Sequence, residues 1–486
     1  MVAPARTAHA SAELPRNSVL EVPYLAQSTL LCGGAAVAMV ERWWGRRGVF
    51  AEEFADLVRP EEGGIRTTDL AMATTRRGWA VRTMQGTAGV VQPALTDSIP
   101  VIALIEVGRD RFHYVVIIGW DDSTVVFHDP AIAPYSEVET AAFLRRWSAA
   151  DDWMMVMTPT IDAPSPAPPD PSNDLAPLPC PPWLGDAVTA TNEHRLAAAE
   201  ALLDSARVHC PAEPLVLRER AGLRFRQGAN AEAARLALDY LAHVPRDSLA
   251  WQLLATSRFL SGDRNGALEA WNEVGRPRLD LFRVTGRSDV RFRVITRATA
   301  LRLGAPLTPN ALALARRRVT DVPAIDNARV DYRPVARGFV ELDIAVREEP
   351  RWPSPPSLLL GAARAAAGGV AELRLGSLAG AGETWEAVWR WRSANPEVAI
   401  RLDAPIGPGV VGVRGEWEEW RFDGSVGETQ RRATTIDLRT WWTGTLESRL
   451  AVRHERWLDE REVIAAGWGI GLHDLDDQLA VLLQGE

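Results

Sequence analysis

The spacing of hydrophobic positions changes along the chain and predicts several domains. In the first 158 residues, strand-like runs such as RFHYVVIIGW and TVVFHDP stand beside a helix-like apolar pattern that follows Cys32. Hydrophobic residues then recur at helical spacing, as in HRLAAAEALLDSARVHC, and from about residue 355 they alternate with a period of two. We therefore expect a multidomain fold with an α+β N-terminal domain, an α-helical middle, an α+β module and an antiparallel β C-terminal region.

The distribution of methionine and proline marks the boundaries between these regions. All seven methionines lie at or before Met157, and ten of the 24 residues from Pro159 to Pro182 are proline. A proline-rich segment is extended and cannot build a core, so it is predicted to be a linker. The predicted divisions are 15–158 (N-terminal domain), 159–183 (Pro-rich linker), 184–276 (helical repeats), 280–352 (α+β module) and 355–486 (antiparallel β region).

The helical region contains a repeat with a spacing of 34 residues. The residues that match at this spacing are Ala221 and Ala255, Phe225 and Phe259, Gly228 and Gly262, and Ala233 and Ala267. Small residues at fixed offsets allow helix pairs to pack closely, and the glycines are predicted to end the first helix of each pair. The pattern resembles the tetratricopeptide repeat, which implies a protein partner on these helices or a spacer role; the alternative is an ordinary pair of helical hairpins.

The segment 280–352 is predicted to run strand, helix, helix, strand, strand. DVRFRVI is expected to be a strand, and NALALARRRVTDV a helix. The consecutive arginines of that helix, Arg316, Arg317 and Arg318, are expected to form a helix surface. ARVDYRPVARGFVELDIAVREEP is predicted to be a hairpin that turns near Gly338. This order resembles a POTRA domain, the periplasmic module that precedes outer-membrane assembly and secretion barrels.

After residue 355, alternation separates aromatic from charged side chains. Trp385, Trp389 and Trp391 share one face of a strand, while Glu386 and Arg390 share the other. About eight strands with an aromatic outer face and a charged inner face are expected, a pattern typical of a transmembrane barrel. GSLAGAGETWEAVWRWRSANPEVAIRLDAPIGPG resembles the early strands of barrels in the outer-membrane assembly family. That family has more strands, so the alternatives are a barrel fragment and a one-sided meander packed on the neighbouring domain.

The amino-acid composition excludes several classes of catalytic and binding site. All 54 basic residues are arginine, which excludes a Walker A phosphate loop, a Schiff-base lysine and a Ser–Lys dyad. The formal net charge of −9 argues against nucleic-acid binding. Cys32, Cys180 and Cys210 form no CxxC pair and suit neither a zinc ribbon nor a disulfide framework. No stretch has the length and apolarity of a membrane helix, and the N-terminus as written lacks the apolar core of a signal peptide.

The segment VPYLAQSTLLCGGAAVAMVERWWG, residues 22–45, carries the candidate nucleophile. Cys32 opens a helix-like pattern, and the dipole and unpaired N–H groups of a helix N-terminus favour a thiolate. Those N–H groups and the side-chain amide of Gln27, five residues upstream, are suited to bind the oxyanion of an acyl-transfer intermediate. Gly33 and Gly34 are expected to allow the close approach of a substrate backbone.

A thiolate nucleophile needs a base, and His113 and His128 are the histidines of the predicted domain. They lie on strands joined by a turn near Asp121. A loop of residues 120–122 would place His113 directly across from Asp129, which could then orient the imidazole. His128 would lie on the opposite face, and a register slip of one residue would reverse these assignments. His113 is therefore the predicted base.

This Gln–Cys–His–Asp order resembles the papain-like double-glycine leader peptidases, which process bacteriocin precursors, and above all their stand-alone relatives with tetratricopeptide repeats. The matching motifs are Val22-Pro23, Gln27, Cys32-Gly33-Gly34-Ala35-Ala36, His113-Tyr114-Val115-Val116 and Asp129-Pro130, with Trp153 in the final strand. The resemblance implies a papain-like fold in which Cys32 is the nucleophile and His113 the base. It further implies that Asp129 orients the base and that Gln27 is an oxyanion donor.

The leading hypothesis is a cysteine endopeptidase that acts on a peptide or protein substrate without a cofactor or metal. The alternative is a catalytically silent peptide-binding or assembly protein of the bacterial envelope, associated with an outer membrane through the C-terminal β region. That region also suggests the cell envelope as the location. Three of the site residues have a plainer explanation as well: Cys32 as a buried structural cysteine, His113 as a structural histidine and Asp129 as part of an Asp-Pro turn.

Overall fold

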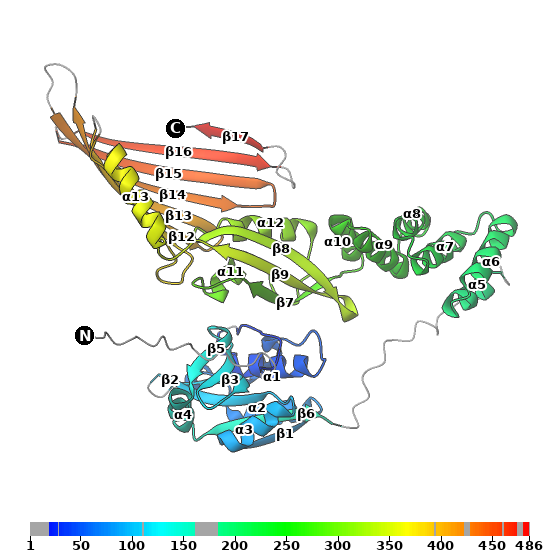
Figure 1. The fold of residues 1–486 in the computed structure, drawn as a ribbon. Coiled ribbons are helices and arrows are strands. Elements are labelled where there is room, and N and C mark those ends of the chain that lie inside the picture. The colour runs from blue at the N-terminus through cyan, green and yellow to red at the C-terminus, as the bar shows by residue number, and fades with distance from the viewer. Residues whose placement is uncertain are drawn as a thin grey trace, which may run out of the picture. The chain divides into compact units, whose positions relative to one another are not determined.

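The computed structural model describes residues 19–27, 29–108, 111–160, 183–392, 395–421, 428–458, 461–473 and 480–485. The chain divides into two compact units, an N-terminal unit (Met1–Ala163 with Arg291–Arg293) and a second unit formed by the rest of the chain (Figure 1). Residues 161–182, most of the predicted linker, and residues 15–18 of the predicted first domain lie outside the described residues.

The N-terminal unit combines helices with one antiparallel sheet. Its helices are α1 (Cys32–Trp43), η2 (Ala51–Leu57), η3 (Pro60–Glu62), α2 (Thr67–Arg76), α3 (Ala88–Thr96) and α4 (Thr140–Ser148). Its strands are β1 (Trp79–Gln85), β2 (Val101–Gly108), β3 (Arg111–Trp120), β4 (Thr124–Asp129), β5 (Ala133–Glu139) and β6 (Trp153–Pro159). Within the described residues the strand order is β1-β6-β2-β3-β4-β5, so the hairpin predicted from RFHYVVIIGW and TVVFHDP is present as β3 and β4.

Packing of α1 against its neighbours explains the paired glycines. A Cβ atom on Gly33 would lie 3.2 Å from the ring of Tyr114 on β3, and one on Gly34 would lie 2.7 Å from the carbonyl oxygen of Ala51. Both glycines are buried inside the unit. Our expectation that they admit a substrate backbone is therefore wrong, because the space that they leave is filled by the protein itself.

The helical region of the second unit consists of consecutive helix pairs. The helices are α5 (Trp183–Asn192), α6 (Leu196–His209), α7 (Leu215–Arg226), α8 (Asn230–Leu241), α9 (Ser248–Leu260) and α10 (Arg264–Asn272). Gly228 (φ 77°) and Gly262 (φ 91°) follow the ends of α7 and α9 in the left-handed conformation, as the repeat predicts. No helix in the described part of the chain has the length and apolarity needed to cross a membrane.

Cys210, which follows α6, is disulfide-bonded. The cysteine spacing predicted no disulfide framework, and it did not reveal the single bond at Cys210. Spacing rules identify dense frameworks in small secreted domains, and they are silent about a single bond that forms wherever the fold brings two thiols together.

The α+β module contains β7 (Arg278–Thr285), α11 (Phe292–Ala298), α12 (Pro309–Thr320), β8 (Ile325–Val335) and β9 (Phe339–Glu348). The predicted order of elements is present, with β9 between β7 and β8 and a turn at Gly338 (φ 75°). The segment DVRFRVI is not a strand, however, because its second half begins α11. Ile295 and Ala298, three residues apart, both pack into the core of the module, and this spacing belongs to a helix.

The consecutive arginines of α12 lie on a half-buried surface of the helix. Each donates to a backbone carbonyl: Arg316 Nε to Val330 O at 2.9 Å, Arg317 Nε to Gly444 O at 3.2 Å and Arg318 Nη2 to Trp441 O at 2.7 Å. The last two acceptors lie at the end of a hairpin in the C-terminal sheet. The arginines of α12 therefore attach the module to this sheet.

The C-terminal region is an antiparallel meander. Its strands are β10 (Val370–Gly376), β11 (Thr384–Arg390), β12 (Glu397–Ile406), β13 (Gly409–Arg421), β14 (Glu428–Trp441), β15 (Leu446–Trp457), β16 (Glu462–His473) and β17 (Ala480–Gly485). Among the described residues each strand pairs with the next along the chain (Figure 1). A helix, α13 (Pro355–Gly368), precedes β10 where we expected strand. The side chain of Ser354 accepts the N–H of Ser357, and Gly369 (φ 73°) ends the helix.

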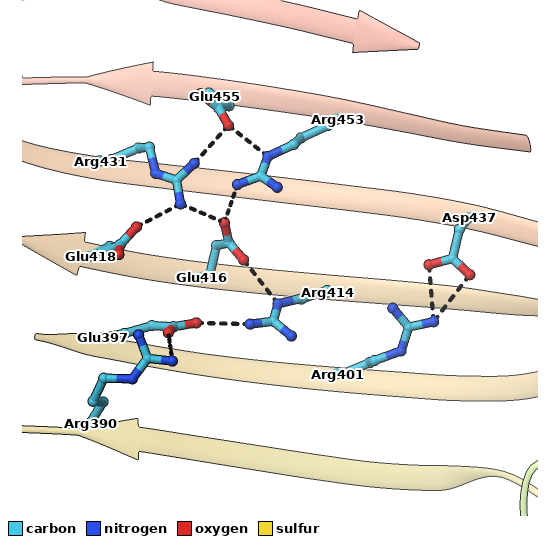
Figure 2. A network of polar contacts seen from close by, with 10 residues as sticks. All are labelled: Arg390, Glu397, Arg401, Arg414, Glu416, Glu418, Arg431, Asp437, Arg453 and Glu455. Atoms are coloured by element: carbon cyan, nitrogen blue, oxygen red, sulfur yellow. Dashed lines mark hydrogen bonds and ion pairs between the residues drawn. The ribbon is translucent and has the colours of Figure 1, made fainter. Parts of the chain in front are cut away.

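The two faces of this sheet differ in chemistry as the alternation predicts. On one face, arginines pair with carboxylates of other strands (Figure 2). Arg431 of β14 contacts Glu455 of the neighbouring β15 at 2.8 Å, and Arg401 of β12 reaches across β13 to Asp437 of β14 at 3.0 Å. On the other face, large apolar side chains are exposed, such as Ile464, of which 74% is accessible to solvent.

Candidate active site

The hairpin loop between β3 and β4 differs from the predicted one. We expected residues 120–122, whereas the loop is residues 121–123. The Asp121 carboxylate accepts the backbone N–H of Ser123 at 2.8 Å and that of Thr124 at 2.7 Å, and both bonds stabilise the turn. The loop therefore starts one residue later than predicted.

A bulge in β3, two residues before its end, then sets the register. Beyond the bulge Val116 pairs with His128, so Asp129 is opposite Val115 and diagonal to His113 on the same face. The prediction that His113 and Asp129 lie directly opposite each other is therefore wrong. Without the bulge, Asp129 would be opposite Val116 and would face away from His113.

The carboxylate nonetheless contacts the imidazole. Asp129 Oδ1 lies 2.7 Å from His113 Nε2, and both side chains are buried. The same oxygen accepts the backbone N–H of Ala131 at 2.8 Å, which fixes its position. Because Nε2–H is donated to Asp129, Nδ1 is the ring nitrogen that remains for Cys32.

Cys32 is the first residue of α1 and lies beside His113. Its thiol makes a hydrogen bond to the His113 side chain and accepts from the backbone N–H groups of Tyr114 and Gly33. Leu31 precedes the helix and offers no side-chain cap, so no capping side chain competes for the first N–H groups of α1. The thiol is thus surrounded by donors.

These contacts shift both pKa values. Burial opposes ionisation of Cys32, but the hydrogen bond and charge of His113 together with the two backbone N–H groups outweigh it and lower the pKa of the thiol. Burial also opposes the charged form of His113, yet the hydrogen bonds to Asp129 and Cys32 raise its pKa to about 9. Both shifts favour a thiolate–imidazolium pair at neutral pH.

His128, the other histidine of the hairpin, has both ring nitrogens engaged away from the thiol. Nε2 donates to Val22 O at 2.7 Å, and Nδ1 accepts the backbone N–H of Tyr135 at 3.1 Å. Burial lowers the pKa of His128 to about 4, and the bond to Val22 offsets only part of this effect. His128 is therefore neutral and structural.

The backbone of Gln27, and not its side chain, makes the described contact with the site. Its N–H donates to Pro130 O at 2.8 Å, next to Asp129. Its Oε1 is buried and has no hydrogen-bond partner among the described groups. The contacts that the structure describes do not join the Gln27 side chain to Cys32 or His113.

Sequence reasoning missed two buried tyrosines that support the site. Tyr24 donates its hydroxyl to Asp129 O at 2.9 Å, and Tyr114 donates its hydroxyl to Ile65 O at 2.9 Å. Both tyrosines lie within the sequence motifs around Cys32 and His113, and this position could have marked them as candidates. Their acceptors are backbone carbonyls far along the chain, and no sequence pattern identifies these.

A buried ion pair, also missed, fixes the far end of α1. Glu41 is fully buried and accepts from Arg77 Nε at 2.8 Å and from Arg46 Nη1 at 3.2 Å. Arg77 continues to Glu53 at 3.0 Å. The helix that begins at Cys32 is therefore held at both ends.

A thiol, an imidazole and a carboxylate in series can perform nucleophilic acyl transfer. The imidazole can accept and return a proton while the carboxylate stabilises its charged form. Within the described residues, no group of three or more His, Cys, Asp or Glu side chains is arranged to hold a metal ion.

A family model, described as the Peptidase_C39 like family, matches residues 19–153. The chain thus carries a peptidase-C39-like domain at its N-terminus. No curated protein matches the chain.

Several solved structures are similar to parts of the chain. The peptidase domain of Streptococcus ComA, a bifunctional ABC transporter of a quorum sensing pathway, is 18% identical with a TM-score of 0.24, and the match covers 29% of this chain and 98% of that one. A C39-like peptidase from Bacillus anthracis is 15% identical with a TM-score of 0.27, again over 29% and 98%. BamA from Haemophilus ducreyi lacking POTRA domains 1–3 is 11% identical with a TM-score of 0.27, over 40% of this chain and 44% of that one.

Proposed function

We propose that the N-terminal domain is a cysteine endopeptidase with Cys32, His113 and Asp129 as its triad. The observation that carries the proposal is the series of hydrogen bonds from Asp129 through His113 to Cys32, which includes the 2.7 Å contact of the carboxylate with the imidazole. The lowered pKa of the thiol and the raised pKa of His113 support a reactive ion pair.

In the proposed reaction, the Cys32 thiolate attacks the carbonyl carbon of a peptide bond, and the carbonyl oxygen becomes an oxyanion. His113 donates its proton to the leaving amine as the C–N bond breaks, which leaves a thioester on Cys32. A water molecule, deprotonated by His113, then hydrolyses the thioester and restores the thiolate. Asp129 stabilises the imidazolium at both steps.

The oxyanion would be bound by the first N–H groups of α1 and by the Gln27 side chain. One observation supports the role of Gln27: its backbone N–H donates to Pro130 O beside Asp129. The donor to the oxyanion would be the side-chain Nε2–H, because Oε1 only accepts hydrogen bonds. Gln27→Ala tests the assignment, and we expect kcat to fall about 100-fold while alkylation of Cys32 is unchanged.

The triad is tested by alkylation of the full chain with iodoacetamide. Trypsin cuts this lysine-free chain only after arginine, so the peptide from Asn17 to Arg42 isolates Cys32. We expect Cys32 to be alkylated faster at pH 7 than an ordinary thiol, and His113→Ala to abolish the difference. An unreactive wild-type Cys32 would contradict the proposal. Cys210 is no reference thiol, because it is disulfide-bonded.

Turnover separates a peptidase from the alternative, a catalytically silent peptide-binding or assembly protein. Peptides with and without a Gly-Gly step are incubated with the full chain and with Cys32→Ser, and cleavage is followed by mass spectrometry. Cleavage by the wild type that is lost in Cys32→Ser supports the peptidase. Binding by both proteins without cleavage by either supports the silent protein.

A second candidate function, association with an outer membrane, is favoured by the apolar face of the C-terminal sheet. Its exposed side chains extend from the first strand of the sheet to the last and include Leu373, Trp389, Ile400, Ile436, Leu450, Ile464 and Leu483. An exposed apolar surface of this kind marks an interaction site, and alternating strands suit a lipid-facing one. The disulfide at Cys210 supports an oxidising compartment outside the cytosol.

Membrane association is tested by sedimentation with phosphatidylethanolamine–phosphatidylglycerol vesicles. We expect the full chain to sediment with vesicles and Ile464→Glu and Leu483→Glu to weaken this. Leu260→Glu is the matched control, because Leu260 is similarly exposed (56%) but lies on α9. Wild-type protein that stays in the supernatant would contradict the proposal.

A further inference from the structure

The extended segment before α1 (residues 22–27) is joined by hydrogen bonds to the end of β4, and each of the two stretches supplies donors. They are His128 Nε2–H to Val22 O at 2.7 Å, Tyr24 O–H to Asp129 O at 2.9 Å and Gln27 N–H to Pro130 O at 2.8 Å. The two stretches are more than 100 residues apart in the chain, so the contact between them depends on these bonds and on packing. We call this set the seam.

The two side chains of the seam are buried and in contact. His128 is fully buried, 8% of Tyr24 is exposed, and their rings meet edge to face with centroids 5.5 Å apart. His128 also accepts the backbone N–H of Tyr135, so its ring joins the segment, β4 and β5. A neutral imidazole with a donor on one side and an acceptor on the other fits this position, whereas an apolar side chain would remove the partner of the Val22 carbonyl, which is buried, and of the Tyr135 N–H.

The seam connects two parts of the candidate active site. On one side, the segment continues from Gln27 into α1, which begins at Cys32. On the other, Asp129 stands between His128 and Pro130. Displacement of a reacting group by about 1 Å can cost about 100-fold in rate, so the alignment of these two stretches matters for the chemistry.

We propose that Tyr24 and His128 are positioning residues, which hold the segment leading to Cys32 against the strand that carries Asp129 and thereby keep thiol, imidazole and carboxylate in line. The inference rests on the proposed peptidase function. Both side chains act through backbone carbonyls: the Tyr24 hydroxyl donates to one, and the His128 ring donates to another. Neither therefore needs to touch the substrate.

The readout is the rate of Cys32 alkylation by iodoacetamide between pH 5 and pH 10 in the full chain, measured on the Asn17–Arg42 peptide. We expect Tyr24→Phe to lower the rate at pH 7 about fivefold, the order of one lost hydrogen bond, and to move the midpoint of the profile to higher pH. His128→Leu should have a larger effect than His128→Gln, which retains a donor for Val22 O.

The matched control is Tyr332→Phe in the second unit, where a buried tyrosine hydroxyl also donates to a backbone carbonyl, Arg264 O, at 2.8 Å. We expect it to leave the alkylation profile unchanged. Circular dichroism checks the fold, and if His128→Leu fails to fold, Tyr24→Phe and His128→Gln carry the test.

The outcomes separate this inference from the function on which it rests. A reactive wild-type Cys32 whose profile is unchanged in Tyr24→Phe and His128→Gln overturns the positioning role but leaves the peptidase standing. A wild-type Cys32 that reacts as an ordinary thiol overturns the peptidase, and the positioning role falls with it. A reactive wild type with shifted profiles in both variants supports both.

Discussion

His113 and Asp129 are joined by a 2.7 Å hydrogen bond although neither is the other's cross-strand partner. The register puts Asp129 opposite Val115, and the carboxylate reaches the imidazole along the diagonal. This is possible because the bulge in β3 corrects the face on which Asp129 lies. The geometry of the candidate triad therefore depends on one extra residue in a strand.

The first prediction concerns Asp129→Asn. An amide cannot stabilise the imidazolium, so the pKa of His113 should fall from about 9 and the thiolate at Cys32 should lose its counter-charge. We expect peptidase activity to fall about 100-fold or more. Asp122→Asn, in the exposed loop of the same hairpin, is the control and should retain full activity. Equal activities of Asp129→Asn and wild type would contradict the triad.

The second prediction is the pH dependence of turnover. Activity needs thiolate and imidazolium together, so kcat/KM should rise as pH passes the lowered pKa of Cys32 and fall as pH rises through about 9, where His113 loses its proton. Alkylation of Cys32 needs only the thiolate and should not fall at high pH. Parallel profiles of cleavage and alkylation would contradict the role of His113 as the acid.

The third prediction is an acid-dependent loss of stability caused by His128. Its pKa is depressed from 6.5 to about 4 in the fold, so the unfolded chain binds the proton first and stability is lost as pH falls from about 6.5 to about 4. The total effect is roughly 3 kcal/mol. Hydrogen exchange of β4 amides measures it. His128→Gln should flatten the dependence, and His454→Gln, at an exposed position of β15, should not.

The fourth prediction compares two carboxylates that pair with one arginine. Glu41 is fully buried, whereas 38% of the Glu53 side chain is exposed, and both contact Arg77. Glu41→Gln should destabilise the N-terminal unit by about 1.5–3 kcal/mol, because a neutral amide replaces the buried carboxylate that accepts hydrogen bonds from Arg77 and Arg46. Glu53→Gln should cost less than about 1 kcal/mol. Urea unfolding monitored by hydrogen exchange in α1 distinguishes them.

Much of the candidate site could be predicted because its chemistry is local in sequence. Cys32 before an apolar helix, His113 within a strand and Asp129 before a proline each follow from short patterns. The contact of Asp129 with His113 was predicted on the correct face of the sheet, but the predicted register was wrong, because Asp129 lies opposite Val115 and not opposite His113. Loop length and the bulge both shift the register, and neither has a marker in the sequence.

The failures have physical causes as well. The helix α13 was not predicted, although Ser354 and Gly369 cap it. The strand pattern that begins after the helix was assumed to begin at residue 355, so the leucines of the helix were assigned to a strand. The two glycines after Cys32 were predicted to make room for a substrate backbone. They make room for Tyr114 and Ala51 instead, and both of these residues are distant in the chain. Predictions failed where a residue's role depends on a partner that only the tertiary fold supplies.

The meander order of the C-terminal sheet has a consequence for how the chain folds. Every strand there pairs with its neighbour in sequence, so each ladder closes only a short loop. In the N-terminal unit, Trp79 of β1 pairs with Pro159 of β6, 80 residues later in the chain, and the sheet is incomplete until its first and last strands have met. Chains rich in local contacts fold faster. We therefore expect the C-terminal sheet to assemble hairpin by hairpin during refolding, while the thiol at Cys32 acquires its reactivity only in a later, slower phase.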